Sequence, residues 1–179
     1  MKKTIWVCGV IAGIISISWA VAGEPLLGDS LSLSTRLIFG YATMILGFSL
    51  IFVAIKNYRD NQNNGQVTFG KALGIGILIT LIASTVYVVV WMIEFKYFVP
   101  DYGEKYTAQM LAEMKASGKS AVEIQKKGAE LSATFKEYNA SAMFRVMFTY
   151  LEIAPIGIVI SLIGALILKK KSKQIIINA

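Results

Sequence analysis

Few side chains in this sequence have types and positions that could support chemistry, and the most prominent is Glu152. It lies about two turns inside the apolar stretch 146–168, three residues before Pro155. Proline has no amide hydrogen to donate to the carbonyl of Leu151, so a free acceptor lies beside this carboxyl group. A charge inside a membrane span costs roughly 2.5–3.5 kcal/mol at its centre and less near its edge. We therefore expect Glu152 to face other helices, to be protonated or to pair with a cation, and Pro155 to kink the helix.

Three other charged residues are expected at the same level of a membrane as Glu152. They are Glu94, Arg36 and Arg145, and the four together form a candidate intramembrane polar cluster. In such a cluster the two carboxylates would handle an ion or a proton. The alternative is an interfacial Glu152 that extends its carboxylate into water and has no functional role.

Other reactive groups are scarce. The sequence has no histidine and one cysteine, Cys8. This composition excludes imidazole acid–base chemistry, Cys/His zinc sites and an intrachain disulfide. Cys8 lies in an apolar run, where we expect it to pack as a small hydrophobic side chain. Because no nucleophile–base pair and no set of metal ligands is evident, the sequence predicts a protein that is not an enzyme and has no cofactor or metal.

Four apolar segments must position the charged residues. Of the 179 residues 55% are hydrophobic and 16% are charged, whereas a soluble domain carries about 25% charged residues. A helix needs roughly 20 apolar residues to cross about 30 Å of hydrocarbon. The four qualifying segments are about residues 4–22, 37–55, 72–93 and 146–168. We therefore expect an all-α integral membrane protein with four transmembrane helices, forming a single membrane domain over residues 1–179.

The first of these segments has a second interpretation. Basic Lys2 and Lys3, the apolar run and the small residues of Ala20-Val21-Ala22 also resemble a cleavable secretory signal. The apolar run is longer than the usual 7–15 residues of a signal, which favours a retained span. Cleavage before Gly23 would leave three spans, and N-terminal sequencing of the mature protein distinguishes the two cases.

The distribution of charge predicts how the spans are oriented. With the N-terminus in the cytoplasm, the cytoplasmic segments hold nine basic residues and one acid, Asp60, whereas the outer segments hold nine basic residues and ten acids. Both termini are therefore predicted to be cytoplasmic. The net charge of +7 is then a topology signal and not the signature of a nucleic-acid-binding protein. The basic tail should attract anionic lipid through Lys169, Lys170, Lys171 and Lys173.

The longest connection, about residues 101–140, is predicted to form an extracytoplasmic amphipathic helical hairpin between the third and fourth spans. Apolar residues recur at helical spacing in both halves, and Ser117-Gly118 separates them. Ser120-Ala121-Val122-Glu123 fits a capping box at the start of the second helix. The two helices either pack on each other at the membrane surface or present a docking face to a partner or a second copy.

Small residues at four-residue spacing predict where helices approach closely. Such positions are Gly9 and Gly13 in the first span, Gly76 in the third, and Gly157 and Ser161 in the fourth. Packing within one bundle is the first interpretation, and association of two copies through the same faces is the alternative.

Several short segments form a recognisable pattern in their order and spacing. They are residues 40–44, 48–56, 58–60, 67–72, 100–102, 104–106 and 151–157. Taken together, these segments resemble a bacterial family described as a domain of unknown function, DUF 4199. The resemblance covers nearly the whole chain and implies four spans in the same order, in a bacterial cytoplasmic (inner) membrane. It implies no activity and no catalytic residues.

These observations favour a non-enzymatic membrane protein with a structural, accessory or interaction role. Its surroundings would be the lipid bilayer, with a membrane partner or a second copy as further contacts. The alternative is a small transporter or channel subunit in which Glu152 and Glu94 handle ions or protons.

Overall fold

The computed structural model describes residues 1–170, with the side chain of Asp29 excepted, and this part of the chain is almost entirely helical. Four continuous helical stretches are long and apolar enough to cross a membrane, and each contains one of the four predicted apolar segments. These stretches are Lys2–Leu27, Leu33–Gln62, Phe69–Tyr97 and Ala142–Leu168. The helices are α1 (Lys2–Ser18), α2 (Glu24–Leu27), α3 (Leu33–Phe48), α4 (Leu50–Asn57), α5 (Phe69–Tyr97), α6 (Tyr102–Ala116), α7 (Ala121–Ala140) and α8 (Ala142–Leu168).

The helical stretches are longer than the apolar segments from which they were predicted. The first extends from α1 through a π-helical turn, Trp19–Gly23, into α2, and the second extends from α4 through another such turn, Tyr58–Gln62. Apolar composition marks the part of a helix that lipid can cover, whereas the backbone hydrogen bonds continue into polar sequence until a cap ends them.

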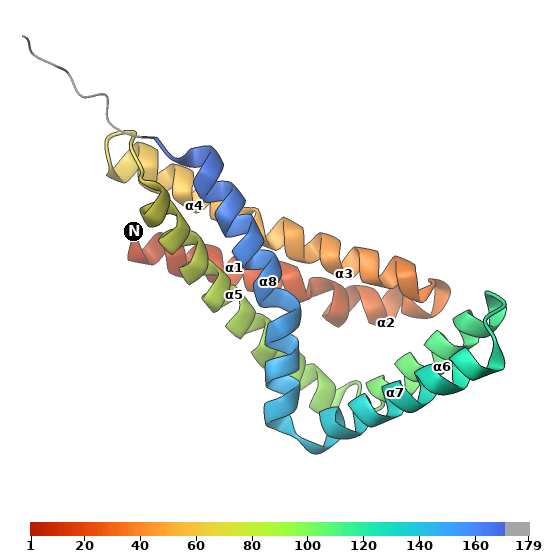
Figure 1. Cartoon of the computed structure of the whole chain (residues 1–179). Coiled ribbons are helices and arrows are strands. Elements are labelled where there is room, and N and C mark those ends of the chain that lie inside the picture. The colour runs from red at the N-terminus through yellow and green to blue at the C-terminus, as the bar shows by residue number, and fades with distance from the viewer. Residues whose placement is uncertain (171–179) are drawn as a thin grey trace, which may run out of the picture.

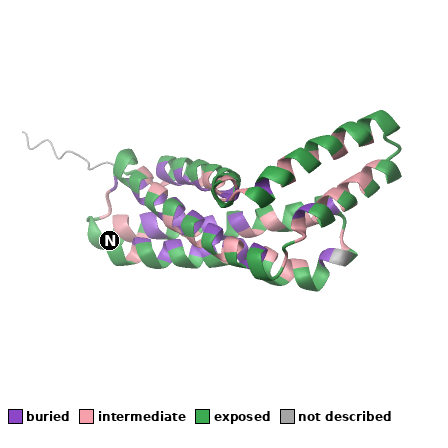
Figure 2. Cartoon of the chain, turned by 90° about the horizontal axis from the view of Figure 1, so that it is seen from below, coloured by how far each residue is buried: buried purple, intermediate pink, exposed green. Residues whose placement is uncertain are grey.

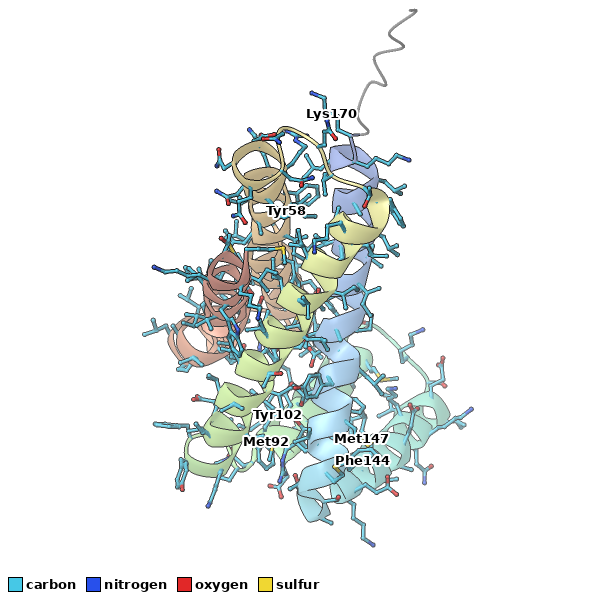
Figure 3. All side chains as sticks on the ribbon, turned by 90° about the vertical axis from the view of Figure 1, so that its left-hand side faces the viewer. Tyr58, Met92, Tyr102, Phe144, Met147 and Lys170 are labelled. Carbon is cyan, nitrogen blue, oxygen red and sulfur yellow. The ribbon has the colours of Figure 1, made fainter. Side chains whose placement is uncertain are left out.

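The two ends of the bundle differ in character (Figures 1 and 3). α1 and α5 begin, and α4 and α8 end, at one end, where Tyr58 and Lys170 are found. We call this the basic end, because lysines flank each of these helix termini. Tyr102 and Phe144 lie at the opposite end, from which α6 and α7 project. We call that the hairpin end.

The α6–α7 hairpin has the local structure that its sequence predicts. Gly118, with φ of +74°, turns the chain between the two helices. The capping box is formed, since the Ser120 hydroxyl accepts from the amide of Glu123 at 3.3 Å and the Glu123 carboxylate accepts from the amide of Ser120 at 3.0 Å. Most of the hairpin surface is exposed or half-buried, in contrast to the buried centre of the bundle (Figure 2).

α5 and α8 approach each other through small residues. A Cβ atom added to Gly157 would lie 2.4 Å from Thr80 Cγ2, and one added to Gly76 would lie 2.6 Å from Ser161 Oγ. The hydroxyls of Thr80 and Ser161 are 3.3 Å apart, and each also donates to a carbonyl of its own helix. The two backbones are therefore close enough for hydroxyl groups in the middle of the spans to come into contact.

α1 packs against α5 in the same manner. A Cβ atom added to Gly9 would lie 2.7 Å from Ile82 Cβ, and one added to Gly13 would lie 2.6 Å from Val86 Cβ. These glycine faces are occupied by the chain itself, so they are not open to a second copy in this arrangement.

The core lies where these helices meet, and the outward faces of the spans are apolar as well. Phe48, Ile51 and Ile153 are fully buried, whereas Leu46 and Leu151 are more than half exposed. Large hydrophobic side chains on the outside of a helical bundle are the pattern that contact with lipid requires.

α8 is a single helix that contains Pro155. Figure 1 shows that α8 changes direction near its middle, where Pro155 falls in the sequence. Proline removes one hydrogen bond of the helical ladder and crowds the preceding turn, which is a physical cause for such a bend.

The close approach of α5 and α8 gives a stability prediction. Gly157→Ala should lower the midpoint of thermal unfolding in detergent, because the new methyl group overlaps Thr80 and overpacking of this kind costs about 1–3 kcal/mol. Gly164→Ala is the matched control on the same helix, since its Cβ would meet Ile55 Cδ1 at an ordinary 3.4 Å. Equal midpoints for the two variants would contradict the packing described here.

Candidate functional site

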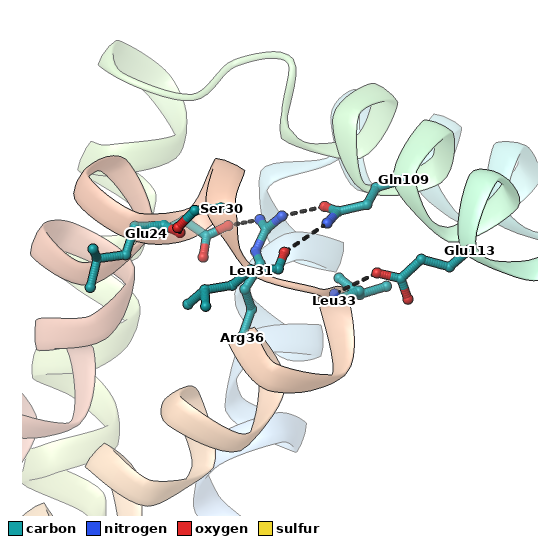
Figure 4. Close-up of polar contacts among 8 residues, drawn as sticks. Glu24, Ser30, Leu31, Leu33, Arg36, Gln109 and Glu113 are labelled. Atoms are coloured by element: carbon teal, nitrogen blue, oxygen red, sulfur yellow. Dashed lines mark hydrogen bonds and ion pairs between the residues drawn. The ribbon is translucent and has the colours of Figure 1, made fainter. Parts of the chain in front are cut away.

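The charged residues of the hairpin end are built into the contact between α6 and the start of α3 (Figure 4). Arg36 in the first turn of α3 forms an ion pair with Glu24 of α2 and donates a hydrogen bond to the Gln109 side chain of α6. Gln109 in turn donates to the carbonyl of Leu31 at 3.3 Å. Arg36 therefore joins the neighbouring helices α2 and α3 to α6, which is distant in the sequence.

A second contact uses the N-terminus of α3 itself. Leu33 is the first residue of α3 and is 4% exposed. Its amide has no carbonyl within the helix to bond, and it donates to Glu113 Oε1 of α6 at 2.6 Å (Figure 4). The carboxylate also lies at the positive end of the α3 dipole, where a negative charge is stabilising. Glu113 thus caps α3 from another helix. We call these contacts of Arg36 and Glu113 the α3 anchor.

The base of the hairpin is held by aromatic rings instead. Trp91 and Phe95 at the end of α5 pack edge-on against Tyr102 of α6 and Tyr138 of α7, with ring centroids 5.1 and 5.5 Å apart. The Trp91 ring nitrogen also donates to the Tyr138 hydroxyl at 2.5 Å. Edge-to-face pairs contribute energy beyond the area they bury. We call this group the aromatic anchor.

Arg145 at the start of α8 belongs to the aromatic anchor. Its guanidinium lies 4.1 Å from the ring centroid of Phe95 and 5.5 Å from that of Tyr138, and it donates to the carbonyl of Tyr138 at 2.7 Å. The side chain is 9% exposed. A buried guanidinium between aromatic faces is stabilised by cation–π attraction without a carboxylate partner.

The four residues of the predicted polar cluster therefore lie at the same end of the bundle but do not pair with one another. Within residues 1–170, Glu152 and Glu94 form no ion pair. Glu94 is 8% exposed on α5, whereas Glu152 is exposed on α8. Arg36 and Arg145 are instead engaged in the two anchors of the hairpin.

The electrostatics of Tyr102 reflect the charge of Glu152. Burial raises the pKa of the Tyr102 hydroxyl, and the negative charge of Glu152 raises it further, while Arg36 acts in the opposite direction. The charge of Glu152 also raises the pKa of Tyr106, although burial is the larger cause there. Both tyrosines are on α6, so the charge of Glu152 acts on the hairpin.

Sequence reasoning did not identify Glu24, Gln109 and Glu113 as functional positions. Glu24 and Glu113 were counted only as outer acids. Ser32 is a recognisable N-cap, and the backbone amides that follow it, including that of Leu33, need hydrogen-bond acceptors from outside the helix. No pattern within one segment, however, indicates that the acceptor comes from residue 113.

The basic tail is described only at its start. The backbone groups of Lys170 pair with those of Val67 in both directions, at 3.0 and 2.9 Å, and both lysines 169 and 170 are at the basic end. Lys171 and Lys173 lie outside the described residues. In the described part of the chain, no group of three or more metal-ligating side chains is close enough to hold a metal ion.

The described residues thus form an all-α protein that has four helical stretches able to span a membrane and a helical hairpin docked against them. A family model described as "Protein of unknown function (DUF4199)" matches residues 8–170. The chain belongs to this family, and the resemblance seen in the sequence is confirmed. No match was found among curated proteins or among solved structures.

The α3 anchor gives a prediction about hairpin docking. Glu113→Ala should speed amide hydrogen exchange at residues 33–36 and along α6, because hydrogen bonds to charged groups contribute about 1.5–3 kcal/mol. Glu113→Gln should have a smaller effect, since its amide oxygen still accepts. Glu104→Ala is the control, because Glu104 is exposed on the same helix. Exchange at wild-type rates in Glu113→Ala would show that the anchor does not hold the hairpin.

Proposed function

We propose that this protein is a non-enzymatic accessory protein of a bacterial inner membrane, and that its α6–α7 hairpin is a fixed platform for a partner. The observation that carries this proposal is that the charged and aromatic residues at the hairpin end hold the hairpin to the bundle. Arg36, Glu113 and Arg145 are all engaged in holding the hairpin to the bundle. Groups engaged in this way maintain a shape and are not free to react.

The surface of the hairpin supports the same proposal. It carries a groove of about 400 Å³ between α6 and α7, lined by Glu104, Ala108, Ser132, Lys136 and their neighbours. These side chains are exposed and of both signs of charge. A mixed polar surface held on a rigid support is suited to specific recognition, because little order has to be gained on binding.

The orientation is part of the proposal. The described residues at the basic end include Lys2, Lys3, Lys56, Lys71 and Lys170. The positive-inside rule then gives cytoplasmic termini and a hairpin on the outer side. The partner would accordingly be a membrane or extracytoplasmic protein.

The proposal predicts the outcome of site-specific photo-crosslinking in cells. A crosslinker at Ala108 or Ser132 should capture one defined protein, because both line the groove. A crosslinker at Phe39, which is 44% exposed on a span, should give lipid adducts and no such protein. Recovery of only lipid or of self-adducts from the groove positions would count against a heterologous partner.

A second function is supported by Glu152. An ionisable side chain within a membrane span is costly and is usually retained for transport or proton transfer. Here its charge acts on α6, and neither Glu152 nor the buried Glu94 has an ion pair within the described residues. A small transporter or channel subunit that handles ions or protons through these carboxylates is therefore the alternative proposal.

Flux measurements separate the two proposals. If the protein transports, Glu152→Gln should abolish proton- or ion-coupled flux in proteoliposomes while expression stays normal, because the amide cannot release a proton or hold a cation. Glu137→Gln, at an exposed position on α7, should transport like the wild type. The transport proposal loses its basis if the wild-type protein moves no ion or solute across a broad panel.

A further inference from the structure

At the basic end, α1 and α5 leave a groove between them that no part of the described chain fills. The groove has a volume of about 490 Å³ and is lined by Met1, by Ile5 of α1 and by α5 residues between Gly70 and Leu78, Gly74 among them. Nearly all of its lining is apolar, and Lys71 lies at the end where both helices begin.

Two glycines give this groove its space. Gly70 and Gly74 are one helical turn apart on α5, and a Cβ atom added to either would meet nothing within 4 Å. The glycines at which helices pack behave differently, since a Cβ at Gly76 would lie 2.6 Å from Ser161. Gly76 is therefore small because another helix lies against it, whereas Gly70 and Gly74 face no protein atoms.

The length of the groove matches one leaflet of a bilayer. From Gly70 to Leu78 the helix rises by about 12 Å at 1.5 Å per residue. Half of a hydrocarbon core of about 30 Å is about 15 Å. An extended acyl chain that entered from the basic end would thus lie along the groove across most of the thickness of that leaflet.

The charge at the mouth of the groove selects the headgroup. Lys71, in the first turn of α5, lines the groove, and Lys2 and Lys3 are in the first turn of α1 at the same end of the bundle. Asp60 is the acid of the described segments at this end, and it is already paired with Arg59 at 2.6 Å. α1 and α5 also both begin here, so their dipoles add positive potential. Such a surface attracts anionic lipid.

We propose that the α1–α5 groove is a binding site for one anionic phospholipid, with an acyl chain over Gly70 and Gly74 and the phosphate among Lys2, Lys3 and Lys71. The site is at the opposite end of the bundle from the hairpin, and on α5 it lies close to Val67, whose backbone pairs with that of Lys170. It would tie α1 to α5 at the end where no loop connects them.

Native mass spectrometry of the protein in mild detergent tests this site with added phosphatidylglycerol and phosphatidylcholine of the same chains. The wild type should retain one phosphatidylglycerol and prefer it by about 30-fold or more, as expected for two or three lysines at an anionic headgroup. Lys71→Gln should reduce this preference. Gly74→Leu should lower retention of both lipids by about tenfold, because its Cβ has open space and the rest of the side chain would occupy the groove.

Gly40→Leu is the matched control, since its Cβ would lie 3.8 Å from Trp19 in ordinary contact, and it should bind lipid like the wild type. Gly70→Leu provides a second groove-filling variant if Gly74→Leu does not fold. Wild-type retention in either folded groove variant would overturn the proposal. So would equal binding of the two lipids by the wild type, or a protein dimer that only the groove variants lose.

Discussion

The close approach of α5 and α8 is the contact on which the rest of the structure depends. Lipid supplies no hydrophobic drive to bring helices together, so spans associate where small side chains let their backbones meet. Gly76 and Gly157 provide this at the level of Thr80 and Ser161. Once α8 is fixed on α5, Arg145 lies against Phe95 and the hairpin between the two helices has a defined base. The aromatic anchor is thus a consequence of packing several turns away.

The fold could be predicted because each of its signals is local. A run of about 20 apolar residues specifies a span wherever it occurs, and the capping box at Ser120 specifies a helix start from four residues. The ends of the spans were predicted less well, because a helix that leaves the apolar region stops only at a cap or a turn. The π-helical turn Trp19–Gly23, which carries the first span on into α2, leaves no mark in hydropathy.

The candidate site could be predicted only in part, because the contacts that form it join residues distant in the sequence. The sequence placed Glu152, Glu94, Arg36 and Arg145 at one level of the membrane, and the structure puts them at one end of the bundle. Their partners were not evident, because pairing depends on how helices distant in sequence are arranged. Arg36 meets Gln109 across 73 positions of the chain, and Arg145 is stabilised by rings instead of by a carboxylate. Counting charges along the sequence does not reveal that aromatic rings stabilise the Arg145 guanidinium.

The two anchors make the hairpin a crossbar. α3 diverges from α8 toward the hairpin end, and the hairpin crosses between them (Figure 1). It is fixed to α5 and α8 by rings and to α3 by polar contacts. Spans respond to a thicker or thinner bilayer by changing their tilt. A change in the tilt of α3 relative to α8 would therefore alter the distance that the crossbar bridges and would load the hairpin mechanically.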